Sequence, residues 1–271
     1  MIRLFQLICL SLALSLTHGA PLRAGGLSDV VRLEMRPGWQ MDDGTYMVAM
    51  HLHLAPGWKT YWRAPGDAGL PPGFDWDGSV NLAGVALHWP TPVAFWQAGM
   101  RSIGYERELV LPMQLRPERP GRPVQLRGEV HLGVCRDVCI PLDLSFDVTA
   151  AGSARPDPVI KAALADRPLS AAEARVQGLG CVVEPAPDGL VLRLGMQMPQ
   201  AARYGAMVIE TADPNIWVAE PSMDHAGDTI TATTRLIHAS GGAFALDRSG
   251  LRVTLLGAGQ AVDIAGCPAP E

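Results

Sequence analysis

The sequence has no recognisable catalytic motif and, after its first twenty residues, no apolar segment long enough to cross a membrane. It contains no carboxylate pair at a spacing typical of acid–base catalysis, no nucleophile-elbow motif and no glycine-rich phosphate loop. Basic runs are also missing, and the formal net charge of −5 at pH 7 argues against a nucleic-acid partner. The five cysteines are therefore the residues whose chemistry needs the closest attention.

Residues 1–20 are typical of a secretory signal peptide with an approximate cleavage site. Arg3 supplies the positive start, residues 4–16 are almost wholly apolar, and small residues follow. Cleavage after Gly19 or Ala24 also fits this pattern. An uncleaved membrane anchor is the alternative, but the apolar run is shorter than the roughly 20 residues that span a bilayer. We expect an exported periplasmic protein without a membrane span, in a compartment where disulfides persist.

Short alternating segments bounded by glycine and proline dominate the rest of the sequence, and no long helical period occurs. In residues 46–54 the apolar side chains fall on one side, whereas His51 and His53 fall on the other, where we expect them at the surface of an open sheet. Four or more such segments with turn residues between them predict an all-β fold of antiparallel sandwiches.

A linker-like stretch interrupts this alternation at residues 151–176. It is rich in proline and alanine, and residues 159–165 and 170–176 could form short helices. Alternation resumes beyond it. We expect one β-domain at residues 25–150 and a second at residues 177–268, and a single continuous sandwich is the alternative.

Cys135 and Cys139 follow and precede two alternating runs, and both lie on the face opposite the apolar one. If the runs pair as a hairpin around residues 136–138, the two sulfurs face each other across adjacent strands. A disulfide can bridge that distance. The sequence therefore predicts an exposed dithiol that can open and close.

The two cysteine pairs of the expected mature chain differ in what a disulfide would contribute to stability. The chain-entropy model assigns roughly 4 to 5 kcal/mol to a bond between Cys181 and Cys267, but only about 2 kcal/mol to the small ring closed by Cys135 and Cys139. We interpret the first pair as a structural disulfide, and two unpaired cysteines are the alternative. Val138 resists the left-handed conformation that a tight three-residue loop favours, so the loop is expected to be irregular or strained and its disulfide easily reduced.

Other roles stay open for Cys135 and Cys139. The pair could be a plain structural disulfide. Its thiolates could also bind copper together with His131 and a methionine such as Met100 or Met113.

Four motifs together resemble the amino-terminal periplasmic domain of the DsbD thiol:disulfide interchange family. They are residues 57–72, 89–92, 104–112 and 134–141. The likeness is closer to the ScsB-type, copper-tolerance-associated branch of that family and covers about residues 30–150. The second expected domain resembles an additional β-domain of the same branch.

The resemblance implies an immunoglobulin-like domain whose cysteine pair accepts electrons from a membrane-embedded partner and passes them to oxidised periplasmic proteins. Cys135 and Cys139 match the active pair of the family, and Tyr61 matches one of its active-site tyrosines. A cap loop shields the sulfurs in relatives. Residues 95–99 correspond to this loop, with Phe95 or Trp96 as the shielding residue.

The family protein continues into a multi-helix membrane domain and a thioredoxin-like domain, and this sequence contains neither. We therefore expect a separately encoded thioredoxin-like or membrane-embedded redox partner, together with periplasmic disulfide substrates. The leading hypothesis is a thiol-disulfide exchange module that needs no cofactor and no metal, with the direction of electron flow left open. The alternatives are a non-enzymatic copper-binding or copper-tolerance protein using the same thiols, and an interaction protein with two inert disulfides.

Overall fold

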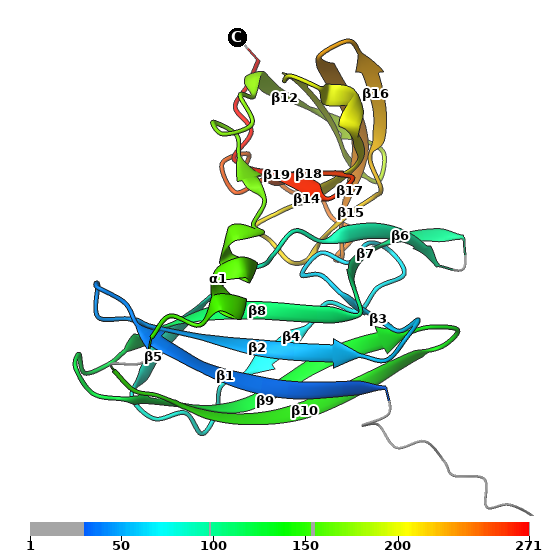
Figure 1. The fold of residues 1–271 in the computed structure, drawn as a ribbon. Helices are drawn as coiled ribbons and strands as arrows, with labels where there is room; N and C mark the ends of the chain where they lie inside the picture. The colour runs from blue at the N-terminus through cyan, green and yellow to red at the C-terminus, as the bar shows by residue number, and fades with distance from the viewer. Residues whose placement is uncertain (1–29, 98, 153–154, 271) are drawn as a thin grey trace, which may run out of the picture.

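The computed structural model describes residues 30–97, 99–152 and 155–270, and Figure 1 shows that strands dominate this part of the chain. The predicted fold class is confirmed: the protein is all-β, with two immunoglobulin-like sandwiches in tandem and a short, partly helical connection. The predicted signal peptide, residues 1–20, lies outside the described residues. Within the described residues, no helix combines the length and the apolar character needed to cross a bilayer.

The amino-terminal sandwich consists of two sheets that face each other across an apolar core. The first, the β2 sheet, has the order β1 (Val31–Gln40), β2 (Tyr46–Leu54), β8 (Glu108–Pro117) and β5 (Leu82–Leu87). The second, the β9 sheet, has the order β10 (Cys139–Ala150), β9 (Val124–Cys135), β3 (Lys59–Tyr61), β7 (Met100–Glu106) and β6 (Val93–Gln97), and β4 (Gly73–Asp75) also pairs with β9.

Alternation explains which side chains fill this core. Val48, Met50 and Leu52 of β2 are buried, as are Val130 and Val134 of β9. All five belong to one apolar cluster. Burial of such side chains is the main source of stability in a sandwich of this kind.

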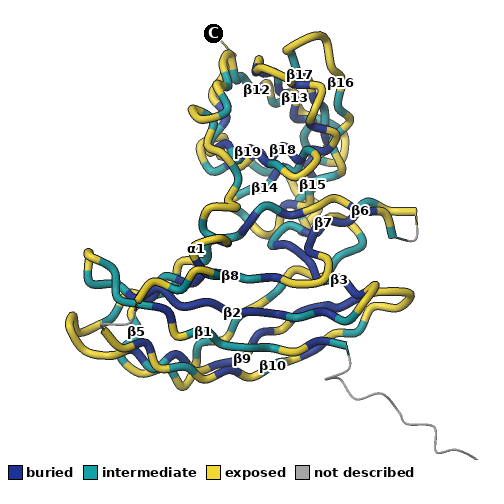
Figure 2. Tube along the Cα trace, viewed as in Figure 1, coloured by how far each residue is buried: buried dark blue, intermediate teal, exposed yellow. Residues whose placement is uncertain are grey.

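The predicted surface position of His51 is wrong, because β2 is buried along almost its whole length (Figure 2), including residues on the outer face of the β2 sheet. Ile160 of the helix α1 packs there against Met47 and Ala49. His51, further along the strand, is only 6% exposed, and its Nε2 lies 3.0 Å from Oε2 of Glu108. Alternation gives the side of the sheet on which a residue lies, but it does not show what covers that side.

The connection between the sandwiches contains one helix, α1 (Pro158–Ala165). Asp157 caps it by accepting hydrogen bonds from the first backbone N–H groups, and Arg36 of β1 donates to the same carboxylate at 2.9 Å. The expected helix at residues 170–176 is absent, because residues 169–170 form the short strand β11 (Leu169–Ser170) and residues 171–175 form turns.

The carboxy-terminal sandwich also has two sheets. One has the order β11, β19 (Gln260–Ala265), β18 (Arg252–Gly257) and β14 (Tyr204–Glu210), with β11 parallel to β19. The other has the order β12 (Gln177–Ala186), β13 (Gly189–Gln197), β17 (Thr229–His238) and β15 (Ile216–Val218), and β16 (Ser222–Ala226) also pairs with β17. A 3₁₀ helix, η2 (Ala201–Arg203), precedes β14. We propose that the two sandwiches are the two β-domains expected from the sequence.

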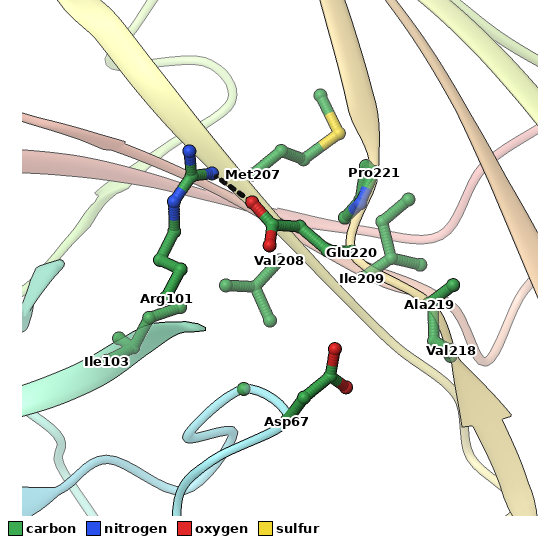
Figure 3. A pocket seen from close by; sticks show the side chains of 11 residues that line it. Asp67, Arg101, Ile103, Met207, Val208, Ile209, Val218, Ala219, Glu220 and Pro221 are labelled. Atoms are coloured by element: carbon green, nitrogen blue, oxygen red, sulfur yellow. Dashed lines mark ion pairs between the residues drawn. The ribbon is translucent and has the colours of Figure 1, made fainter. Parts of the chain in front are cut away.

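The two sandwiches contact each other through ion pairs and apolar packing. The Arg63 guanidinium donates to both carboxylate oxygens of Glu210, at 3.0 and 2.8 Å, and Arg101 lies 2.8 Å from Glu220. Figure 3 shows the second pair beside a cavity of about 60 Å³ that is lined from both sandwiches. Neither a cysteine nor Tyr61 lines this cavity, so the cavity is not part of either disulfide site.

A disulfide joins Cys181 of β12 to Cys267, and both residues are buried in the carboxy-terminal core with their Cα atoms 5.6 Å apart. The bond closes a loop with a sequence separation of 86. Its role as a structural disulfide stays a prediction. The length of the loop sets how much the bond is expected to contribute to the free energy of unfolding.

Replacing both residues, in Cys181→Ser with Cys267→Ser, should lower the free energy of unfolding of the carboxy-terminal sandwich by about 4 to 5 kcal/mol, because the unfolded chain gains the freedom that the bond removes. Hydrogen exchange at increasing urea concentration, read by mass spectrometry on peptides of the carboxy-terminal sandwich, measures this. The matched control is Cys135→Ser with Cys139→Ser. It should lower the free energy of unfolding of the amino-terminal sandwich by about 2 kcal/mol at most, because its ring is small. Equal midpoints for the carboxy-terminal variant and the wild type would contradict the structural role.

Candidate functional site

A disulfide between Cys135 and Cys139 closes the hairpin of β9 and β10. The two residues are direct partners across the strands, and their Cα atoms are 4.1 Å apart. Within the loop, the Arg136 N–H donates to the Val138 carbonyl at 3.2 Å. None of residues 136–138, all of which are described, has a positive φ. The loop thus avoids the left-handed conformation that Val138 would resist, and the Val138 side chain is 64% exposed.

The two sulfur-bearing residues differ in exposure. Cys139 is exposed, whereas Cys135 is fully buried, so the prediction of an exposed pair is wrong for Cys135. Cys135 does lie on the face opposite the core, as alternation predicts. On that face, however, Tyr61 and Phe95 pack against it and form a small buried cluster. The disulfide therefore has one accessible side and one covered side.

Tyr61 contacts both sulfurs. Its hydroxyl donates to Sγ of Cys135 at 2.8 Å and lies 3.2 Å from Sγ of Cys139. Burial raises the pKa of Tyr61 above the ordinary value of 10, and the hydrogen bond with Gln97 only partly opposes this. The phenol is therefore protonated at neutral pH and available as a donor to sulfur.

The strand β6 also contacts the disulfide site, through Phe95 and Gln97. Phe95 is buried and stacks on Tyr61, with ring centroids 6.5 Å apart. Gln97 donates from Nε2 to Sγ of Cys139 at 3.3 Å. Trp96, between them, is 65% exposed and lies beneath the Arg101 guanidinium, 5.4 Å from it. Of the two candidate shielding residues, Phe95 packs against the site and Trp96 points away from it.

Sequence reasoning missed Gln97 as a site residue. Alternation within residues 95–97 was an available signal, because it puts Phe95 and Gln97 on the same side of a strand and Trp96 on the opposite side. The contact itself depends on the pairing of β6 with β7, which brings the strand beside Tyr61, and no local pattern in the sequence encodes that pairing.

Charged groups near the site are largely compensated. Lys59 pairs with Glu106 at 3.2 Å, and its ammonium lies 4.3 Å from the centre of the Phe95 ring. Arg136, in the loop between the cysteines, pairs with Asp137 at 2.9 Å. Both cations have carboxylate partners. The hydrogen bond from Tyr61 is therefore the local interaction that most stabilises negative charge on a sulfur.

Comparison with known proteins gives a consistent picture. Residues 31–150 match the family described as the N-terminal domain of thiol:disulfide interchange protein DsbD. The crystal structure of the N-terminal periplasmic domain of ScsB from Proteus mirabilis is similar in fold, with a TM-score of 0.66 and 24% sequence identity, covering 90% of this chain and 95% of that one.

The structure of Yersinia pseudotuberculosis InvD aligns over 88% of this chain and 58% of its own, at 14% identity. Its TM-score of 0.20 is too low to indicate a shared fold. No curated protein sequence matches the chain significantly.

Tyr61→Phe should make the reduced cysteines less reactive, because it removes the hydroxyl that can donate to a thiolate. A hydrogen bond to a charged acceptor contributes about 1.5 to 3 kcal/mol, so the midpoint pH of alkylation should rise by about one to two units. The measurement is the rate of iodoacetamide alkylation of the reduced protein against pH. Tyr46→Phe is the control, since that hydroxyl donates to the Arg122 carbonyl. An unchanged midpoint in Tyr61→Phe would show that the hydroxyl does not act on the thiolate.

Proposed function

Since residues 31–150 form a DsbD amino-terminal-like domain, we propose that the protein is a periplasmic thiol-disulfide exchange module that reacts through Cys135 and Cys139. One observation carries the proposal: a disulfide with one exposed and one covered sulfur, the covered one accepting a hydrogen bond from a protonated tyrosine. This asymmetry suits a disulfide that takes part in exchange, because one cysteine can be attacked by a partner while the other serves as the leaving group.

The exposed sulfur is the point of attack. A partner thiolate attacks Sγ of Cys139, the bond to Cys135 breaks, and Cys135 leaves as a thiolate while Cys139 and the partner share a mixed disulfide. A second thiolate of the partner then displaces Cys139 from that mixed disulfide. The partner dithiol loses two electrons and becomes a disulfide, and the Cys135–Cys139 pair gains them. The reverse sequence of steps reduces a disulfide substrate.

The covered side supports the leaving group. A donor beside the departing sulfur stabilises the charge that develops on it, and a less basic thiol leaves faster. Tyr61 lies 2.8 Å from Sγ of Cys135 and stays protonated, so it is placed to donate to that thiolate. Phe95 shields the same sulfur from water and from other thiols.

Apolar surface near the disulfide supports a protein partner. Val138, in the loop between the two cysteines, is exposed. Leu70, which packs against Gly133 of β9, is 45% exposed. Exposed apolar groups beside a reactive group are common at protein interaction sites. The proposed partners are a thioredoxin-like or membrane-embedded redox protein and periplasmic proteins with disulfides.

Copper binding by the same thiols is the alternative function, and the local geometry favours it less. Sγ atoms joined in a disulfide offer no thiolate ligand, so copper would need the reduced form. Of the residues suggested as further ligands, Met113 is buried in the apolar core and belongs to β8 of the β2 sheet, whereas both cysteines belong to the β9 sheet.

Single-cysteine variants test the assignment of roles. Cys135→Ser leaves the exposed Cys139 free, so it should form a mixed disulfide with an activated single-cysteine thioredoxin-like protein. Cys139→Ser leaves only the covered Cys135, which should react at least about tenfold more slowly because Tyr61 and Phe95 block access. Non-reducing electrophoresis and mass spectrometry quantify the adducts. Equal rates, or faster trapping by Cys139→Ser, would refute attack at Cys139.

Anaerobic titration of the reduced protein with Cu(I) separates the two functions. We expect no tight stoichiometric complex beyond that formed by the control variant Cys135→Ser with Cys139→Ser. Tight binding that this variant abolishes would favour the copper alternative.

A further inference from the structure

A second group of reactive side chains lies on the outer face of the β2 sheet, away from the disulfide in the β9 sheet. Glu34, His51 and His53 each place one possible ligand atom within 4.8 Å of the others. Glu34 of β1 and His51 of β2 are direct partners across the strands, and His53 follows on the same face. Among the described residues, this is the one group of three or more histidine, cysteine or acidic side chains with such a spacing.

His51 has one nitrogen without a partner. Its Nε2 lies 3.0 Å from Oε2 of Glu108, whereas its buried Nδ1 has no hydrogen-bond partner. An unpaired polar atom in a residue that is only 6% exposed costs free energy. When Nε2–H donates to the carboxylate, Nδ1 carries a lone pair. Histidines that bind metals typically donate their other N–H to a carboxylate in this way.

The other two groups complete a set of two nitrogens and one oxygen. The His53 ring centroid lies 3.8 Å from that of His51, and Nε2 of His53 lies 3.4 Å from Oε2 of Glu34. Two imidazoles and a carboxylate suit Zn²⁺ and similar transition-metal ions, whereas Mg²⁺ and Ca²⁺ prefer oxygen ligands.

Two arginines compete for the same carboxylate. Arg32 lies 3.3 Å from Oε2 of Glu34, and Arg36 lies 2.9 Å from Oε1. The Arg32 side chain is 60% exposed and can move into solvent at little cost. Arg36 has a second partner in Asp157. A cation that takes Oε2 from Arg32 therefore leaves Arg36 fully paired.

We propose that Glu34, His51 and His53 form a binding site for one divalent transition-metal ion of the Zn²⁺ class, with Glu108 as a positioning residue that orients His51. The ion would link β1 to β2 and give the unpaired Nδ1 of His51 a partner. The site shares no residue with the disulfide and is independent of the proposed exchange function.

The test is a titration of the full-length mature protein, without a histidine tag and in the Cys135→Ser, Cys139→Ser background, so that no thiol of that pair can bind metal. Zn²⁺ is the probe, with competition against a chromophoric chelator, and Mg²⁺ is titrated in parallel. We expect one equivalent of Zn²⁺ and no comparable binding of Mg²⁺. The melting temperature should rise with Zn²⁺ relative to EDTA, because the ion binds the folded state.

Variants identify the ligands. His53→Asn and Glu34→Gln, at partly exposed positions, should each weaken Zn²⁺ binding at least about tenfold and remove the rise in melting temperature, and Glu108→Gln should weaken binding about tenfold or more through the orientation of His51. The visible spectrum of bound Co²⁺ should change in all three. His131→Asn, on the other sheet, is the matched histidine control and should bind as the wild type does.

Three results would overturn the proposal. They are binding of much less than one equivalent of Zn²⁺, unchanged affinity in both His53→Asn and Glu34→Gln, and an equal loss of affinity in His131→Asn. His53→Asn keeps the test valid even if changes at the buried His51 prevent folding. None of these outcomes bears on exchange by Cys135 and Cys139, which the trapping experiment tests separately.

Discussion

The hydrogen bond from the Tyr61 hydroxyl to Sγ of Cys135 is the interaction on which the candidate site depends. It exists because the three-residue strand β3 lies between β9 and β7 and pairs with both. Lys59 of β3 is the direct partner of Cys135, which places Tyr61, two residues later, beside the end of the β9–β10 hairpin. Through this one strand, a long-range pairing converts a symmetric pair of cysteines into a covered sulfur and an accessible one.

Close backbone approaches hold β3 and the following loop in place. A Cβ atom at Gly104 of β7 would lie 2.0 Å from the Thr60 carbonyl oxygen, so only glycine allows this pairing. Gly69 is packed against the Tyr61 ring and Pro65. Arg63, two residues after Tyr61, makes the ion pair with Glu210 of the other sandwich. The segment that carries Tyr61 is thus tied to both sandwiches, and the carboxy-terminal one contributes to the site by supporting this segment rather than by contacting the sulfurs.

Much of the fold followed from local patterns in the sequence. Alternation located the strands that contain residues 46–54 and both sides of the cysteine hairpin, and it indicated that Cys135 faces away from the core. It could not show that Tyr61 and Phe95 cover that face, because both come from strands distant in sequence. His51 shows the same limit: its side of the sheet was correct, but its burial depends on neighbours from β1 and β8. The unpaired Nδ1 and the cluster with Glu34 became visible only once those strands were paired.

We propose that the Cys135–Cys139 disulfide undergoes exchange in the folded protein, whereas the Cys181–Cys267 disulfide does not. The most direct measurement incubates the native protein with a reduced thioredoxin-like dithiol, alkylates free thiols and maps them by mass spectrometry over time. Alkylation confined to Cys135 and Cys139, before any loss of folded structure, is the expected result. If the Cys135–Cys139 bond stays oxidised against strong dithiols while the protein remains folded, the pair does not act in thiol-disulfide exchange.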